Sequence, residues 1–559
     1  MNETILLDGA WEFGFKTIAL EKVTAGNIPA TTLMTVPGCF DVKPPLFSQW
    51  GTGFYKRSVR CGGKVLLRIA AMGLRGQVFW DGKKLGDILE LPFSPEEIVF
   101  DAGKEGEHIL GIAVENTPHD RSEGKMYAAD YDFYCHGGIY DSVSIRQLPE
   151  YWIQHLEVTP LDHKTKKVKV RLVLTGEVKK STAIEYAFNG GPMVKKTVKG
   201  KELVWEETLK DAQLWTPENP VLQTLTVKTP CDEKEVTFGM RTIAVKNASI
   251  LLNGKPLLLV GYNRHDSHPD FGYALPESTM LYDLQLMKRQ KANFIRGCHY
   301  PQREKFLDLC DRMGFLVWEE VIGWGNQAVH FTNKDFHRRQ LEQAAIMVHK
   351  SMNHPSVIMW GFLNEVYMPK GNSPRPLIRD LVETLHKEDP SRPTTFAFAT
   401  SWRKLSDDDC LDLVDILSFN TYPGWYTSFE KANAICDIEP ELRDLAKYAN
   451  RKDLKNKPLI IGEIGAPGII GDHSGARWSE DYQADLIETV MREFFRNKRY
   501  TGVALWQYCN IRTYITDGFL TRPRGFNNKG LVDEYRNPKL AWHRVTKLLE
   551  EYKFDGYEK

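Results

Sequence analysis

The chain is 559 residues long, more than one hydrophobic core normally serves, which predicts roughly two to four domains. Lysine plus arginine and aspartate plus glutamate number 73 each, so no net charge favours binding to nucleic acid or to an anionic membrane. The cysteines are scattered without a C-x-x-C pair, the amino terminus has no basic and then apolar leader, and no apolar run is long enough to span a bilayer. We therefore expect a cytoplasmic protein with free thiols, and neither nucleic acid nor a membrane as a partner.

The first part of the chain, residues 1–147, predicts a β-sandwich of the jelly-roll, sugar-binding-like type. Short apolar runs, such as 65–69 and 109–114, are separated by turn signals. Asp81-Gly82 has the composition of a two-residue hairpin turn. No helical period lasts beyond a turn or two in this stretch.

The next part, residues 148–242, predicts a second and smaller sandwich. Val168, Val170 and Leu172 alternate with residues that are mostly polar, as in a strand with one buried face. The length of this unit, together with its strand-rich pattern, suits an immunoglobulin-like domain.

From residue 243 to 559 strand-like runs alternate with helical ones. Phe306, Leu309 and Met313 fall on one helical face, and Gly314 is placed to end that helix. The predicted strands are 257–263, 292–297, 315–320, 357–364, 394–399, 416–421, 458–463 and 502–507. Eight strands, each followed by a helix, predict a (β/α)8 TIM barrel, so we expect a multidomain chain of two β-sandwiches followed by this barrel.

Nearly every predicted barrel strand ends in a polar or aromatic residue: the strand 315–320 ends in Glu319-Glu320, and two further strands lead into a glutamate. The run 357–363 is apolar and leads into Asn364-Glu365, and the run 459–462 follows a proline and leads into Glu463. Because barrel active sites lie at the carboxyl ends of the strands, we expect both carboxylates to face one pocket. One carboxyl that donates a proton and another that attacks the anomeric carbon or activates water make a glycosidase.

Several segments resemble glycoside hydrolase family 2, and the resemblance covers essentially the whole chain. They are 7–13 and 36–38 near the amino terminus, 238–242, 252–256 and 263–266 at the entry to the barrel, and 296–301, 311–314 and 353–365 within it. The resemblance implies a retaining reaction through a covalent glycosyl-enzyme intermediate, with Glu365 as general acid/base and Glu463 as nucleophile. It also implies a homo-oligomer, which the family commonly forms.

One short segment bears on the substrate. Asn527-Asn528-Lys529-Gly530 matches the Asn-x-Lys-Gly motif of the β-glucuronidases of this family, where an ammonium and an amide hold the sugar carboxylate. The resemblance therefore implies an exo-β-D-glucuronidase of the bacterial type, acting on terminal β-glucuronides of small molecules or oligosaccharides. A β-galacturonidase or β-galactosidase of the same family would keep both glutamates and stays open. A non-catalytic carbohydrate-binding protein is a further alternative.

The resemblance also assigns residues around the sugar. Asp132 resembles the residue through which the first domain reaches the barrel mouth and contacts a sugar hydroxyl. His299 and Tyr422 resemble residues that bind the sugar or orient the nucleophile. Asn364 resembles the residue that bonds the 2-hydroxyl.

Aromatic walls and a further cation complete the implied site. Tyr426 and Trp506 resemble the aromatic walls of the pocket. Glucuronidases of this family often place an arginine shortly before the Asn-x-Lys-Gly motif. We assign this role to Arg524, with Arg522 as the alternative.

We expect no cofactor to be required for hydrolysis. No metal constellation stands out, because His265, Asp266 and His268 are expected to order the barrel floor and the pocket. Certain microbial relatives bind a flavin nucleotide away from the active site, and this stays open here. The segment 322–333, where some bacterial relatives carry a long loop over the site, is short, which predicts an open mouth that tolerates larger aglycones.

Overall fold

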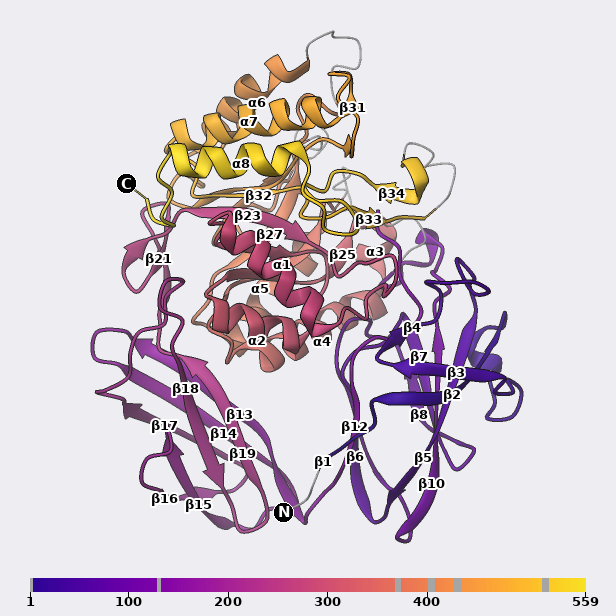
Figure 1. Cartoon of the computed structure of the whole chain (residues 1–559). Coiled ribbons are helices and arrows are strands. Elements are labelled where there is room, and N and C mark those ends of the chain that lie inside the picture. Colours follow the sequence, from indigo (N-terminus) through magenta and orange to yellow (C-terminus); the bar gives the residue numbers. More distant parts are fainter. Residues whose placement is uncertain are drawn as a thin grey trace.

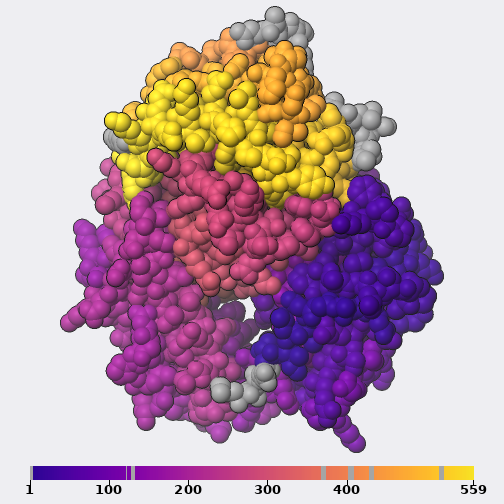
Figure 2. Space-filling model, in the orientation of Figure 1, coloured from indigo at the N-terminus to yellow at the C-terminus, as the bar shows by residue number. Residues whose placement is uncertain are grey.

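The computed structural model describes residues 4–127, 132–366, 373–400, 408–426, 434–514 and 522–558. Two β-sandwiches stand side by side beneath a barrel that is surrounded by helices (Figure 1). A hollow lies between the two sandwiches directly beneath the barrel (Figure 2), and the sandwiches also contact each other through an ion pair of 3.3 Å between Arg146 and Asp232. Within the described ranges, no helix has the length and apolar character needed to cross a membrane. The predicted fold class, two sandwiches followed by a barrel, is confirmed.

The first sandwich contains β1 (Thr4–Leu6), β2 (Gly9–Lys16), β3 (Thr32–Val36), β4 (Gly38–Cys39), β5 (Thr52–Cys61), β6 (Lys64–Ile69), β7 (Arg75–Trp80), β8 (Lys83–Leu89), β9 (Glu96–Asp101), β10 (Gly106–Glu115), β11 (Gly138–Ile139) and β12 (Val143–Gln147). Its sheets have the orders β1-β12-β6-β9 and β3-β2-β5-β10-β7-β8, with β11 paired to β4. Asp81 and Gly82 join β7 to β8 with φ of 48° and 80°, as the predicted hairpin turn requires.

The second sandwich contains β13 (Tyr151–Asp162), β14 (Lys167–Gly176), β15 (Ser181–Phe188), β16 (Val194–Lys199), β17 (Glu202–Thr208), β18 (Leu222–Lys228) and β19 (Glu233–Gly239). A sheet of order β13-β14-β17 faces one of order β16-β15-β18-β19. Val168, Val170 and Leu172 on β14 are fully buried in the core between these sheets, which confirms the predicted alternation.

A small sheet of β20 (Ile243–Lys246), β21 (Ser249–Leu252) and β22 (Lys255–Pro256) leads into the barrel. The barrel strands close in sequence order and are β23 (Leu259–Arg264), β24 (Phe294–Gly297), β25 (Leu316–Trp324), β26 (Val357–Asn364), β27 (Thr394–Ala399), β28 (Leu417–Asn420), β29 (Leu459–Ile464) and β32 (Gly502–Leu505). All eight predicted strands are present. Neighbouring strands pair in parallel, so their carboxyl ends meet at one mouth of the barrel.

The helices around the barrel are α1 (Glu277–Arg289), α2 (Glu304–Met313), α3 (Ala328–Thr332), α4 (Lys334–Ser351), α5 (Arg375–Glu388), α6 (Ile438–Tyr448), α7 (Glu480–Arg496) and α8 (Leu540–Glu551). Short pairs of strands, β30 (Gly468–Ile469) with β31 (Trp478–Ser479) and β33 (Ile511–Arg512) with β34 (Phe526–Asn527), lie among the last loops. The helix predicted at Phe306 ends as expected, because Gly314 caps α2 with φ of 70°.

The segment after the third barrel strand differs from the prediction in detail. β25 continues to Trp324, beyond the predicted end at 320, because Trp324 still pairs with Asn364 on β26. The short helix α3 then occupies most of the remaining connection to α4.

Candidate active site

The polar side chains at the carboxyl ends of the barrel strands gather around Arg296, at the end of β24. Its fully buried guanidinium donates hydrogen bonds from Nε to Oε1 of Glu320 (2.7 Å) and from Nη1 to Oε1 of Glu463 (2.8 Å). Nη2 donates to Oδ1 of Asn364 over 2.9 Å. Burial disfavours the charge of Arg296, but the carboxylates of Glu320 and Glu463 outweigh this effect and raise its pKa. Arg296 is thus a permanent cation that orients three side chains of the site.

Glu365 follows β26 directly, where the backbone departs from strand geometry. The φ angles of Leu363 and Glu365 are 49° and 50°, a conformation that is uncommon for residues other than glycine and is enriched at functional sites. This departure from regular strand alternation lets consecutive side chains share one partner. Nδ2 of Asn420 donates to Oδ1 of Asn364 (2.9 Å) and to Oε1 of Glu365 (3.1 Å). Burial, and then the negative charge of Glu463, raises the pKa of Glu365 to about 8.

Glu463 on β29 has a different environment. Its Oε1 accepts the hydrogen bond from Arg296, and its Oε2 accepts one of 2.6 Å from the hydroxyl of Tyr422. Burial raises the pKa of the Glu463 carboxyl, and these two donors act against that rise. The two predicted glutamates therefore lie in one pocket in environments that separate their protonation.

Only one member of the Glu319-Glu320 pair faces this pocket. Successive strand residues point to opposite faces, so Glu320 bonds Arg296 inside the barrel while Glu319 accepts a 2.9 Å hydrogen bond from Nζ of Lys350 on α4. Glu319 is therefore part of the contact between strand and helix.

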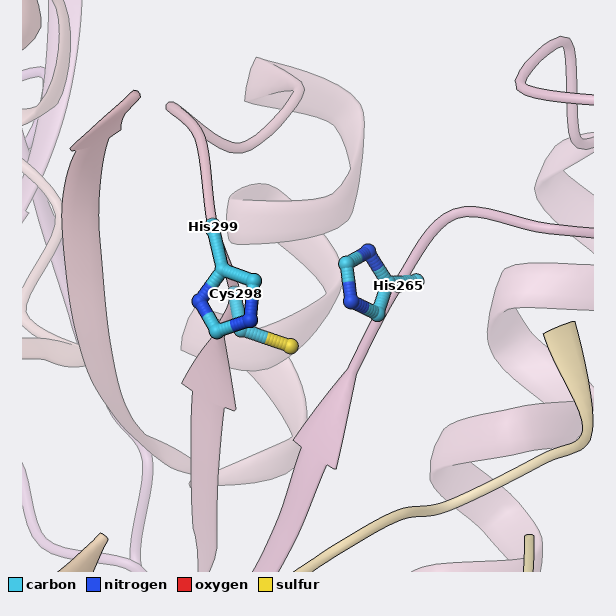
Figure 3. Close-up of side chains that lie close together, drawn as sticks. All are labelled: His265, Cys298 and His299. Atoms are coloured by element: carbon cyan, nitrogen blue, oxygen red, sulfur yellow. The ribbon is translucent and has the colours of Figure 1, made fainter. Parts of the chain in front are cut away.

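Two imidazoles lie beside these carboxyls. His299 stacks on Trp506 with ring centroids 5.3 Å apart, and its Nε2 is 3.8 Å from Oε1 of Glu463. His265, just after β23, approaches His299 edge-on at 5.3 Å, and Figure 3 shows both rings together with Cys298. Nε2 of each ring is buried without a hydrogen-bond partner among the described residues. Both nitrogens are therefore available to a polar ligand.

Lys529 lies in a second polar cluster, next to Tyr422. Its side chain is 1% exposed, and its ammonium donates to the hydroxyl of Tyr426. The ammonium lies 4.8 Å from the ring centroid of Tyr422 and 4.3 Å from that of Tyr426. Burial lowers the pKa of Lys529. In the part of the chain that the structure describes, no carboxylate forms an ion pair with this lysine.

Asp132 brings the first sandwich into the same cluster. Its Oδ2 accepts hydrogen bonds from Nη2 of Arg522 (2.7 Å) and from Nδ2 of Asn527 (3.1 Å). Arg522 also donates to the hydroxyl of Tyr426 over 3.3 Å, and the exposed Tyr426 lies at the solvent side of the cluster. Oδ1 of Asp132 and Nε of Arg522 are buried without a partner among the described residues.

Arg524, which we predicted as the cation of this cluster, lies outside it. Its guanidinium donates to Oε1 of Glu534 (2.7 Å) and to Oδ1 of Asn528 (3.3 Å), and its side chain is 52% exposed. The backbone at Arg524 has φ of 62°, within an irregular turn, so strand or helix periodicity does not set the direction of its side chain. Arg522 takes the predicted position.

The turn that contains Lys529 packs closely against neighbouring segments and is hydrogen-bonded to them. A Cβ at Gly530 would lie 2.2 Å from the backbone nitrogen of Asn510, so the close approach of these two segments requires glycine. Nζ of Lys539 donates to the carbonyl oxygen of Asn528 (3.0 Å), to that of Gly468 (2.6 Å) and to Oδ1 of Asn510 (2.9 Å). Burial lowers the pKa of Lys539 to about 7.

The structure brings the other predicted site residues together and adds some that had no predicted role. Arg296, Glu320 and Asn420 contact the two glutamates or Asn364, as described above. Arg296 and Asn420 stand at or next to the carboxyl ends of their strands, and Glu320 ends the predicted strand 315–320, so this position is the signal that could have identified them.

Comparison with known proteins agrees with this architecture. The family model described as "Glycosyl hydrolases family 2, TIM barrel domain" matches residues 243–554, and the one described as "Glycosyl hydrolases family 2" matches 152–241. A β-glucuronidase of Sus scrofa is 28% identical over 538 residues, which cover 88% of this chain and 80% of that protein. A β-glucuronidase of Streptococcus agalactiae is 27% identical, over 96% of this chain and 94% of the relative.

A solved structure extends the comparison to the whole fold. The crystal structure of a family 2 β-galacturonidase from Eisenbergiella tayi aligns with a TM-score of 0.89 at 30% sequence identity, covering 100% of this chain and 98% of that one. The matched barrel domain makes up more than half of the chain and contains both glutamates. The protein therefore belongs to glycosyl hydrolases family 2 and is a glycoside hydrolase.

Proposed function

We propose that this protein is a retaining exo-β-D-glucuronidase, with Glu365 as general acid/base and Glu463 as nucleophile. The observation that carries the substrate class is the buried ammonium of Lys529, which has no carboxylate partner within the described ranges. A buried charge without a counter-charge is unfavourable, and the carboxylate of a uronic acid would supply that counter-charge. The β-glucuronidases among the relatives support the same substrate class.

The neighbours of Lys529 suit the rest of such a sugar. Asn527 and Arg522 add directed donors beside the ammonium, and Oδ1 of Asp132 is a free acceptor for a sugar hydroxyl. A neutral hexose would leave the ammonium without a carboxylate to pair with, so the cluster should discriminate strongly against galactosides and glucosides.

In the first chemical step, the protonated carboxyl of Glu365 gives its proton to the glycosidic oxygen. At the same time the carboxylate of Glu463 attacks C1, which forms a glycosyl ester and releases the aglycone as an alcohol. The raised pKa of Glu365 keeps it protonated near neutral pH, and the bonds from Arg296 and Tyr422 hold Glu463 in place.

In the second step, Glu365 acts as a base. Its carboxylate, now ionised, takes a proton from a water molecule whose oxygen attacks C1, and the ester bond to Glu463 breaks. The sugar leaves with its original β configuration, and both carboxyls return to their starting protonation states.

Two measurements test the assignment of the carboxyls. A 2-deoxy-2-fluoro-glucuronyl fluoride should leave a covalent sugar on a peptide that contains Glu463, detected by mass spectrometry of the digested protein. Proton NMR of the first product should show the β anomer. An α anomer as first product, or a label on another residue, would disprove the assignment.

The substrate class is tested with matched substrates. The wild type should show a kcat/KM on 4-nitrophenyl β-glucuronide that exceeds the value on the β-galactoside by at least about 1000-fold, a ratio that we estimate from the cost of unpaired buried polar groups. Lys529→Ala should remove most of that preference while leaving the galactoside rate nearly unchanged. A wild type that prefers the galactoside would contradict the uronide proposal and leave the glycosidase mechanism intact.

A β-galacturonidase is the second candidate, and a specific observation favours it. The solved Eisenbergiella tayi relative named for that activity is 30% identical to this chain, above the identities of the two β-glucuronidases described above. Galacturonic acid carries the same carboxylate and differs only at C4, so the Lys529 cluster suits both sugars. The relative kcat/KM on 4-nitrophenyl β-glucuronide and β-galacturonide decides between them.

A further inference from the structure

Three side chains of types that can bind metal ions meet where the second sandwich contacts the barrel, away from the two catalytic glutamates. His155 and Glu157 lie on β13, His349 lies on α4, and one ligand atom of each is within 4.8 Å of the other two. Nδ1 of His349 is 2.8 Å from Oε1 of Glu157, and Nδ1 of His155 is 3.9 Å from the same oxygen. The two imidazole rings lie 4.6 Å apart between centroids. Both ring systems and the carboxylate thus converge on one small volume.

The backbone explains this convergence. An irregularity in the pairing of β13 falls between Ile153 and His155, and such a bulge changes the direction of the side chains that follow it. His155 and Glu157 are two residues apart on the strand and therefore share a face. His349 stands in the last turn of α4, where the ends of the peptide dipoles favour a positive charge.

We propose that His155, Glu157 and His349 bind a divalent transition-metal ion, best suited to Zn²⁺, that ties the second sandwich to the barrel. Two imidazoles and one carboxylate are an established zinc ligand set, and the fourth position of a tetrahedral ion is then taken by water. The side chains of His155 and His349 are 28% and 24% exposed, so this fourth position can reach solvent.

Binding of the metal ion displaces one proton from the site. The hydrogen bond between His349 and Glu157 is replaced by a bond from each of these side chains to the ion, and the proton between them leaves to solvent. The metal requires imidazole nitrogens without protons, so its affinity falls at low pH.

Outer partners already hold the proposed ligands in position. Nη1 of Arg171 is 3.0 Å from Oε2 of Glu157, the oxygen that does not face His349. Nε2 of His349 is 3.3 Å from Oε2 of Glu388, the last residue of α5, which leaves Nδ1 for the ion. A carboxylate on the far nitrogen of a histidine ligand is a common feature of zinc sites.

The strand that carries two ligands is also attached to the barrel. Asn353, just beyond α4, accepts a 2.9 Å hydrogen bond from the backbone nitrogen of Val158 and donates one of 2.9 Å to the carbonyl oxygen of Leu156. His155 and Glu157 alternate with these two residues on β13. The distance between the ligands therefore depends on a contact that hydrogen bonds already maintain.

The other groups of three potential metal ligands in the described part of the chain are weaker candidates for a new metal site. His265, Cys298 and His299 belong to the catalytic pocket described above. The remaining groups are Asp308 with Asp311 and His354, in which Asp311 already accepts bonds from His354 and Ser356, and Asp408 with Asp409 and Asp412, which pair with Arg375 and Arg451.

The test uses the full-length protein after treatment with EDTA. Isothermal titration with ZnCl₂ at pH 7.5 should show a site with one ion per chain, and ZnCl₂ should raise the melting temperature. His155→Gln and His349→Gln should each weaken that binding by at least about tenfold. CaCl₂ should have no such effect, because calcium prefers oxygen ligands.

His337→Gln is the matched control, since His337 lies on the same helix, pairs with Asp380 over 3.0 Å and is not part of the cluster. This variant should bind Zn²⁺ as the wild type does. Unchanged glycosidase rates in the two ligand variants would show that they are folded. A wild type without micromolar Zn²⁺ binding, or with binding that both ligand substitutions leave intact, would overturn the proposal. An anomalous diffraction peak between the three side chains would establish it directly.

Discussion

The hydroxyl of Tyr422 donates a 2.6 Å hydrogen bond to Oε2 of Glu463, the carboxylate whose other oxygen is bound by Arg296. Tyr422→Phe removes one of these two donors and keeps the ring. We expect kcat/KM on an activated glucuronide to fall about 10- to 100-fold, the range for a hydrogen bond to a charged group. Tyr282→Phe, on the exposed face of α1, should leave the rate unchanged. An equal loss in both variants would contradict a specific role of Tyr422.

The pH dependence of kcat/KM follows from the two carboxyls. Glu365 must be protonated to act as an acid, and its pKa is raised to about 8, so activity should decline as the pH rises through that value. Glu463 must be ionised, so activity should also decline at low pH. Because burial raises the pKa of Glu463, this decline should begin at a higher pH than for an ordinary glutamate. A bell-shaped profile is expected.

Glu365→Gln should abolish the decline at high pH and slow the release of poor leaving groups more than that of 4-nitrophenol. Glu383→Gln, at an exposed position on α5, is the matched control and should retain the wild-type profile. A high-pH limb that persists unchanged in Glu365→Gln would assign that limb to another group.

Arg522 and Arg524 form a matched pair for a test of the Lys529 cluster. Arg522→Ala should reduce kcat/KM on 4-nitrophenyl β-glucuronide by about 10- to 100-fold, because Arg522 is the donor that bonds both Asp132 and Tyr426. Arg524→Ala should change kcat/KM by less than about threefold, because the half-exposed Arg524 bonds Glu534 instead. A larger loss of kcat/KM in Arg524→Ala than in Arg522→Ala would contradict this assignment and indicate that Arg524 binds the substrate.

Lys539 should matter for substrate binding without contact to the substrate. Lys539→Met removes the buried ammonium that donates to two carbonyl oxygens and to the amide oxygen of Asn510, so we expect a loss of about 2–3 kcal/mol of unfolding free energy. The turn that carries Lys529 should loosen, which raises KM for the glucuronide more than it lowers kcat. Lys547→Met, at an exposed position of α8, should change neither the melting temperature nor KM.

Much of the fold could be predicted from local patterns. The apolar runs that end in Glu365 and Glu463 are strands in the structure, and Gly314 ends its helix as its position predicted. Barrel geometry then allowed the two glutamates to be assigned to one pocket, although 98 positions separate them. Hydrophobic periodicity and turn composition act over a few residues, so they can be read without knowledge of the rest of the chain.

Other features depend on contacts between distant segments. Spacing alone did not distinguish Arg522 from Arg524, because an irregular turn directs their side chains. Asp132 meets Asn527 across 395 positions, and His349 meets Glu157 across 192, and no local pattern links either pair.

The sequence by itself thus determined the two sandwiches, the order of the barrel strands and the two glutamates at strand ends. Tertiary structure alone decided which arginine joins the Lys529 cluster, how Arg296 connects Glu463 to Asn364, and that two histidines and a glutamate converge between domains. The physical reason is that secondary structure follows from local periodicity, whereas these contacts follow from barrel closure and from the packing of one domain on another.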